Sequence, residues 1–294
     1  MHRIIKTDFH KIVTGYGMYL CVLFTIILCF GTSIHIDMMN NDQYSVIRSL
    51  ISFDREFMLS SYDFISINVA LKGAGSWLSM FIPIISAFAY IPLVCDESES
   101  KSIRNAVFRS SKLKFYLSRF ITAVLSGGFA VMIGYMAFCR MVFILFPGIG
   151  EYPAETREFY IQYLSDVYPS TADLGIGSAL VIKFAEIFVY GAIAAIPAIL
   201  LTAVSKNKYV VLCIPFFIKY ALTQTSVKLI AQAYSNGEGV GGKLTDISNV
   251  INLDYVLQIY EMKGYKLIAV YIIVAISTLA LYLFIQLRRF DSGE

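Results

Sequence analysis

The chain of 294 residues is strongly apolar: hydrophobic residues make up 57%, charged residues only 15%, and the mean hydropathy is +0.66. Soluble domains carry about 25% charged residues, so the composition excludes an ordinary soluble protein. The length fits several membrane spans of about 20 residues each, with their loops. A net charge of +3 is too small to indicate a nucleic-acid partner.

The first 17 residues predict an amphipathic helix on the inner membrane surface, because Ile4, Phe9 and Ile12 recur at helical spacing against Lys6 and Lys11. The alternative is that these residues are the first turns of a membrane span. The apolar stretch that follows is longer than the core of a signal peptide, and no clear cleavage site follows it. A retained span is therefore expected.

Unbroken apolar stretches predict six membrane-spanning helices. In chain order they cover residues 18–36, 77–94, 115–138, 179–204, 209–227 and 266–287. Prolines inside three of these spans indicate kinks, which membrane helices tolerate where neighbours satisfy the freed carbonyl groups. The predicted fold class is an all-α polytopic membrane protein, with residues 1–294 forming a single transmembrane domain.

The distribution of Lys and Arg predicts the orientation. The amino-terminal segment, the segment between the second and third spans, residues 205–208 and the carboxyl terminus carry most of these residues near span ends. Cytoplasmic loops carry such an excess, so both termini are expected in the cytoplasm. The three loops on the other side are long and acidic, and loops of such length usually carry structure or function.

The segment between the second and third spans begins with acidic residues and ends with basic ones. Between them Ile103, Val107 and Phe108 form an apolar stripe at helical spacing. A short helix over residues 101–109 that exposes this stripe to the cytosol needs a protein partner. The alternative is a solvated charged loop that only enforces the topology.

This segment resembles the permease subunits of type-two ATP-binding-cassette (ABC) exporters. In that family the second span ends in an acidic turn, followed by a coupling helix, a Ser/Arg-containing turn and a basic residue that opens the third span. The matching positions are Asp96, Glu97 and Glu99 for the acidic turn, 102–108 for the helix, 110–112 for the turn and Arg119 for the basic residue. The chain departs from the family at Ser100, often Gly, and at Arg109, often Pro.

The resemblance implies a function in transport. It implies a pathway lined by the second and fifth spans, a second permease copy or a paralogous permease, and a separate cytosolic ABC ATPase that binds ATP and Mg²⁺. It also implies a bacterial plasma membrane and export of a hydrophobic or amphipathic substrate such as a peptide, bacteriocin or drug. The expected ATPase-coupling residues are Glu97, Glu99, Ile103, Arg104, Val107 and Phe108.

The chain itself offers no convincing nucleotide or metal site. Residues 237–244 satisfy Gly-x4-Gly-Lys but have Leu244 where a magnesium-binding Ser or Thr is required. The three histidines are isolated, and no cluster has metal-ligand spacing. The five cysteines lie in or beside apolar runs, as buried structural cysteines do. We therefore expect a pathway-forming subunit that is not an enzyme and binds no cofactor.

Three charged residues within the spans are candidates for a functional site, because charge in the membrane interior is costly. Lys183 and Glu186 lie three residues apart and can pair on one helix face. Lys219, in the fifth span, is expected to face water in the pathway or to pair with Glu186. The alternatives are a structural ion pair for the first two and snorkelling to the surface for Lys219.

Two alternatives to the exporter permease belong to other function classes. An ATP-independent secondary transporter would show broken spans near the midplane and internal symmetry, but no paired interruptions are present. A membrane-embedded enzyme would need a catalytic motif, and neither His-Glu-x-x-His, nor Gly-x-Ser-x-Gly, nor an intramembrane carboxylate pair occurs.

Overall fold

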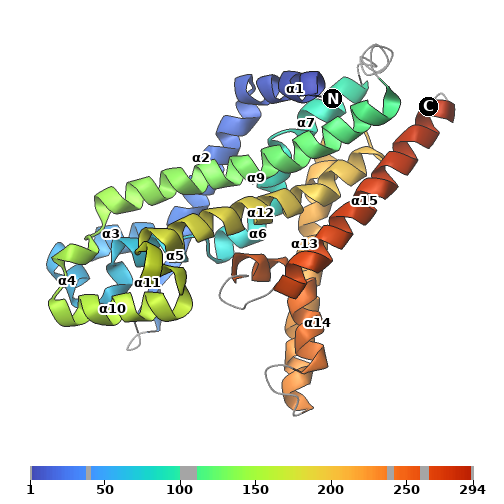
Figure 1. Ribbon diagram of the computed structural model, residues 1–294. Helices are drawn as coiled ribbons and strands as arrows, with labels where there is room; N and C mark the ends of the chain where they lie inside the picture. Colours follow the sequence, from blue (N-terminus) through green and yellow to red (C-terminus); the bar gives the residue numbers. More distant parts are fainter. Residues whose placement is uncertain (1, 38–40, 100–110, 237–241, 259–264, 293–294) are drawn as a thin grey trace.

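The computed structural model describes residues 2–37, 41–99, 111–236, 242–258 and 265–292. These residues are mostly helical (Figure 1). Five helical segments are long and apolar enough to cross a membrane: 77–99, 112–151, 177–202, 208–235 and 267–288. A bent pair formed by the first two helices supplies a sixth candidate. The chain is thus a polytopic helical membrane protein, as its composition predicts.

The elements follow one another along the chain with two strands near the start. They are α1 (His2–Thr14), α2 (Tyr16–Gly31), β1 (Ser33–Asp37), β2 (Asp42–Ser45), α3 (Val46–Ser52), α4 (Arg55–Ser60), η1 (Tyr62–Phe64), α5 (Ser66–Lys72), α6 (Ser76–Phe88), α7 (Ile91–Glu99), α9 (Lys112–Leu145), η2 (Ile149–Glu151), α10 (Ala154–Val167), α11 (Ser170–Leu174), α12 (Gly177–Thr202), α13 (Lys208–Ser235), α14 (Lys243–Ile251), η3 (Leu253–Gln258) and α15 (Tyr265–Ser292).

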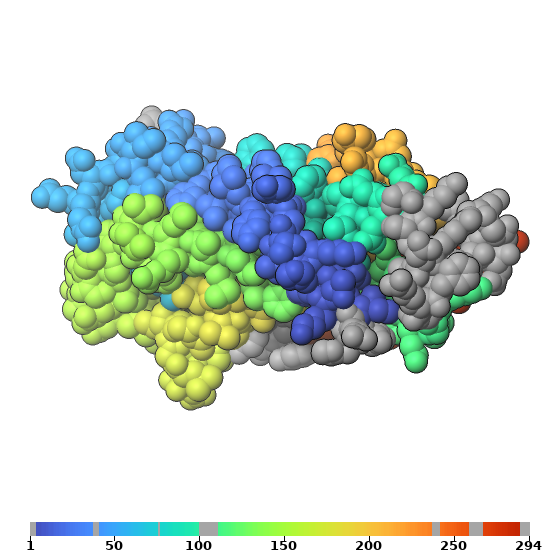
Figure 2. All heavy atoms as spheres, turned by 90° about the horizontal axis from the view of Figure 1, so that it is seen from above, coloured from blue at the N-terminus to red at the C-terminus, as the bar shows by residue number. Residues whose placement is uncertain are grey.

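The amino-terminal helix α1 meets α2 at an angle of 60°. Gly15 occupies the bend, where a Cβ would stand 2.9 Å from the carbonyl oxygen of Lys11. Figure 2 shows α1 at the surface of the molecule, against the helices below it, and the Phe9 ring packs edge-on against Phe129 of α9 at 6.3 Å between centroids. The bend sets a first helix apart from the second, and the two together form one broken candidate span. The interfacial position predicted for the first 17 residues stays a prediction.

The first span ends earlier than predicted. The apolar run was expected to continue to residue 36, but α2 ends at Gly31 and the chain continues as strand β1. Strand β1 pairs antiparallel with β2, with His35 opposite Tyr44. The side chain of His35 lies 2.9 Å from the Asp63 carboxylate. The hydrogen bond to Asp63 and the pairing with β2 stabilise this segment as a strand, so a small hairpin interrupts the otherwise helical fold.

Helices α9 and α12 form the centre of the bundle and lie side by side in Figure 1. Small residues on both helices lie at their contact. A Cβ on Gly127 of α9 would stand 2.8 Å from that of Ala195 and 3.2 Å from the carbonyl oxygen of Gly191, both on α12. Helix packing in lipid depends on such close approach, because burial of apolar surface no longer drives association.

Residues 33–37, 41–72 and 148–174 gather at the end of the bundle away from α1 and α7, whereas α14 lies apart, beside α13 (Figure 1). We call these residues, together with η3 (253–258), which packs against α12, the loop domain. Part of it has its own apolar core, which includes Ile65, Tyr160, Leu164 and Tyr168. Helix α1, helix α7 and the last turns of α15 lie together at the opposite end of the bundle. These two ends carry the two clusters of functional interest.

Candidate functional site

Lys219 lies inside the bundle and is held by residues from two other elements. Its Nζ atom is 2.8 Å from Oδ1 of Asp254 in η3 and 3.1 Å from Oγ of Ser79 in α6, and it donates to the Ser79 carbonyl oxygen as well. Only 8% of the lysine side chain is exposed. The ammonium is therefore neither in lipid nor snorkelling, and its charge is compensated by a carboxylate.

The Asp254 carboxylate is the centre of this arrangement. Besides Lys219, it accepts a hydrogen bond from Tyr190 of α12 at 2.5 Å and one from Ser79 at 2.9 Å. Asn252 fixes the turn before it, because its side-chain oxygen accepts from the Asp254 backbone N–H at 3.1 Å. We call Ser79, Tyr190, Lys219 and Asp254 the Lys219 cluster. It joins α6, α12, α13 and η3 through one partly exposed carboxylate.

The pairing of Lys183 with Glu186 is confirmed. The two side chains lie on one face of α12, 3.2 Å apart, and both are almost fully buried. Lys183 also donates to the carbonyl oxygen of Leu257 in η3. Each of the two buried lysines is thus bonded to η3, the short segment before the last span.

The partner that the sequence suggested for Lys219 needs correction. Glu186 was the expected carboxylate, whereas the ion pair that the structure shows is with Asp254. Asp254 lies between the fifth and sixth predicted spans, in the third long loop, where an acidic residue by itself indicates no function. The signal that could have identified it is its place inside the apolar run 250–257, where it is the one charged residue.

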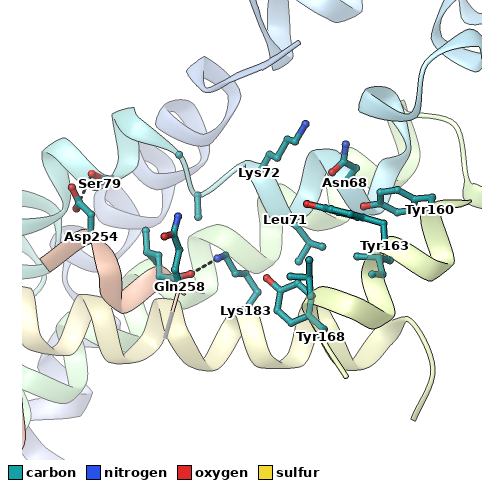
Figure 3. A pocket seen from close by; sticks show the side chains of 15 residues that line it. Asn68, Leu71, Lys72, Ser79, Tyr160, Tyr163, Tyr168, Lys183, Asp254 and Gln258 are labelled. Carbon is teal, nitrogen blue, oxygen red and sulfur yellow. Dashed lines mark hydrogen bonds between the residues drawn. The ribbon is translucent and has the colours of Figure 1, made fainter. Parts of the chain in front are cut away.

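A cavity of about 430 Å³ opens beside the Lys219 cluster, between α5, α10, α12 and η3. Figure 3 shows the side chains that surround it, with the rings of Tyr160, Tyr163 and Tyr168 reaching in from one side. Ser79 and Asp254 line the opposite end, and the dashed line marks the bond from Lys183 to η3. The cavity therefore connects the loop domain to the interior of the bundle.

A second cluster lies at the other end of the bundle, at the base of the predicted coupling segment. Glu97, near the end of α7, accepts from Lys11 of α1 at 2.7 Å and also pairs with the buried Arg119 of α9. The preceding residue, Asp96, pairs with Lys208 at the start of α13 at 3.2 Å. We call these five residues the base cluster. It joins four helices at the point where the chain leaves α7 and returns as α9.

The residues predicted to contact an ATPase are only partly placed. Glu97 and Glu99 belong to the last turn of α7, and Glu97 bonds within the chain. Ile103, Arg104, Val107 and Phe108, with the predicted helix 101–109, lie outside the described residues.

Neither cluster has the composition of a metal centre. Within the described ranges, no group of three or more His, Cys, Asp or Glu side chains is arranged to hold a metal ion. All five cysteines are free thiols, and only Cys213 is exposed. What the two clusters can do is fix the relative positions of helices by charge. No protein-family model, no curated protein and no solved structure matches the chain.

Proposed function

We propose that this chain is the transmembrane permease subunit of an ABC exporter. In this proposal it forms the translocation pathway with a second permease copy or a paralogue. A separate cytosolic ATPase binds ATP and Mg²⁺ and carries out the hydrolysis, so this chain is not itself an enzyme. The setting is a bacterial plasma membrane with both termini in the cytoplasm, and the cargo is a hydrophobic or amphipathic molecule.

The base cluster is the observation that supports this proposal most. A coupling element must pass the movement of a soluble partner on to the membrane helices. Segment 100–110 joins α7 to α9, and its two flanks are tied to each other by Glu97 and Arg119. Lys11 and Lys208 connect the same base to α1 and α13. A displacement of the segment is therefore carried directly to four helices.

The Lys219 cluster adds support at the other end of the bundle. The second and fifth spans, α6 and α13, border the pathway in the exporters that the sequence resembles. Ser79 and Lys219 join these two helices through a bond that can be exchanged for water or for a bond to cargo when the helices separate. Discrete contacts of this kind are what allows a helical bundle to switch between two arrangements.

The proposal is tested with the full chain purified from cells together with its ATPase. Phe108→Asp and Ile103→Asp place a charge in the apolar stripe, and Ser111→Asp, just outside it, is the matched control. Burial of a Phe side chain contributes about 1.5–3 kcal/mol, so we expect ATPase binding to weaken by tenfold or more. Membrane insertion should be unchanged, and the control should behave as wild type.

Normal copurification and normal ATP hydrolysis in both stripe variants would refute the coupling role of the segment. If transport by the wild-type chain in proteoliposomes needs no ATPase but follows an imposed ion gradient, the permease proposal fails as a whole.

One observation favours a second candidate, an ATP-independent secondary transporter. A buried Lys–Asp pair beside a cavity resembles the ionisable groups that couple proton or ion movement to transport in such proteins. The same proteoliposome experiment separates the candidates. Uptake driven by a pH gradient, and abolished in Asp254→Asn, supports the secondary transporter, whereas dependence on added ATP and the ATPase supports the exporter.

A further inference from the structure

The cavity in the loop domain has features that neither helix packing nor the proposed coupling explains. Its volume of about 430 Å³ falls within the range of small-molecule sites. It is lined from segments that are far apart in sequence: α5, α10, the start of α12, and η3. All three long loops thus contribute to one concave site.

One wall of the cavity is aromatic and apolar. Tyr160 and Tyr163 lie one turn apart on α10 with ring centroids 6.0 Å apart, and Tyr168 follows at the end of the helix. Figure 3 shows the phenol oxygens of Tyr160 and Tyr163 directed toward the cavity. Leu71 and Leu257 complete this wall. Such a wall suits a flat or branched apolar group, with which aromatic rings pack well.

The polar groups at the cavity are mainly donors. Tyr160 is 1% exposed, and its hydroxyl has no hydrogen-bond partner among the described residues. Burial raises the pKa of the Tyr160 phenol, so the hydroxyl keeps its proton and can donate. A buried hydroxyl without a partner costs about 1–3 kcal/mol. A ligand that accepts a hydrogen bond from this hydroxyl would remove that cost.

Two lysines add charge to these donors. Lys72, at the mouth, donates one hydrogen bond to the Asp63 carboxylate at 2.8 Å, and its ammonium has three donor N–H groups. Lys183 donates to Glu186 and to the Leu257 carbonyl oxygen. Among the described lining residues the one carboxylate is Asp254, and it already accepts from three donors. The charged groups that line the cavity are therefore two ammonium donors and one carboxylate that is already occupied.

We propose that this cavity is a binding site for an amphipathic small molecule that carries a carboxylate and an aromatic body. The carboxylate accepts from the Tyr160 hydroxyl and from the Lys72 ammonium, a charge-assisted bond of the stronger kind. The aromatic body packs on the tyrosine wall. Rotation of the half-exposed Tyr163 ring, which lies beside Tyr160, opens the way to the hydroxyl. The site goes beyond the proposed function and does not depend on an ATPase.

The test uses the full chain in lipid nanodiscs and two probes that differ in one group. The probes are N-acetyl-phenylalanyl-phenylalanine and its carboxyl-terminal amide, with binding measured by isothermal titration calorimetry. We expect the acid to bind at least fivefold more tightly than the amide. Tyr160→Phe should weaken binding of the acid by about tenfold, because a hydrogen bond to a charged group contributes about 1.5–3 kcal/mol. Lys72→Gln should also weaken it.

The control is Tyr234→Phe, which removes the same hydroxyl from an exposed tyrosine at the end of α13 and should leave the affinity for the acid unchanged. Tyr160→Phe should not reduce thermal stability, since the hydroxyl bonds to no described residue. The proposal is overturned if neither probe binds at millimolar concentration, or if acid and amide bind alike. It is also overturned if both Tyr160→Phe and Lys72→Gln bind the acid as wild type does. A loss of stability in Tyr160→Phe without probe binding would assign the hydroxyl to a structural water instead.

Discussion

Breaking the Lys219–Asp254 pair from one side should cost more than removing both charges. Asp254→Asn leaves an ammonium that is only 8% exposed. Breaking a buried pair by removing one partner costs about 3–5 kcal/mol. The two contacts to Ser79 remain, so we expect the lower end, about 3 kcal/mol.

The reverse single variant should be milder. In Lys219→Met the Asp254 carboxylate keeps its hydrogen bonds from Tyr190 and Ser79, and 29% of its side chain is exposed to solvent. We expect a loss of about 1–2 kcal/mol, comparable with one hydrogen bond to a charged group. The double variant should lose about 2 kcal/mol, well below the sum of the two single losses. The coupling energy is then about 2–3 kcal/mol.

The assay is reversible unfolding of the purified chain in mixed detergent micelles, with the free energy of unfolding compared across the cycle. Lys228→Met is the matched control, because Lys228 is an exposed lysine further along α13, and it should stay within about 0.5 kcal/mol of wild type. If the two single losses simply add in the double variant, the pair contributes no coupling and the reasoning is wrong.

Two further predictions concern topology and packing. In a cysteine-free background that retains its function, a cysteine at Ser111 should be shielded from an impermeant thiol reagent in intact cells, whereas one at Ser235 should react. Labelling at Ser111 in intact cells would show that the orientation is the reverse of the predicted one. Gly127→Ala should destabilise the fold by about 1–3 kcal/mol, because the new Cβ would stand 2.8 Å from that of Ala195. The control is Gly150→Ala, which has nothing within 4 Å of the new Cβ and should leave thermal unfolding unchanged. Equal effects of the two substitutions would show that Gly127 is not part of a tight α9–α12 contact.

Features that follow from local periodicity were predictable from the sequence. The last five spans and the Lys183–Glu186 pair are properties of neighbouring residues along one helix, and the structure shows them. In each case the physical cause lies within a few turns of the chain.

Features that depend on distant segments were not predictable. Asp254 meets Lys219 because η3 folds back onto α12, and no pattern around either residue indicates that return. The β1–β2 hairpin was missed because its apolar residues read as the end of the first span, while the polar partner of His35 lies on η1. The cavity could not be predicted from local periodicity for the same reason, because residues from all three long loops line it.

Helix α9 is long enough to act as a lever. Its 34 residues extend over about 51 Å at the rise of an α-helix, against about 30 Å of membrane hydrocarbon. Near one end Arg119 bonds to Glu97 of α7, and toward the other the Tyr135 hydroxyl donates to the Ala70 carbonyl oxygen of α5. If α9 pivots as one body, a tilt of about 10° at the base of the coupling segment displaces the far end by about 9 Å. The loop domain, which is bonded to α9 toward that far end, then moves with the helix. A small tilt on one side of the membrane thus becomes a displacement of several ångströms on the other.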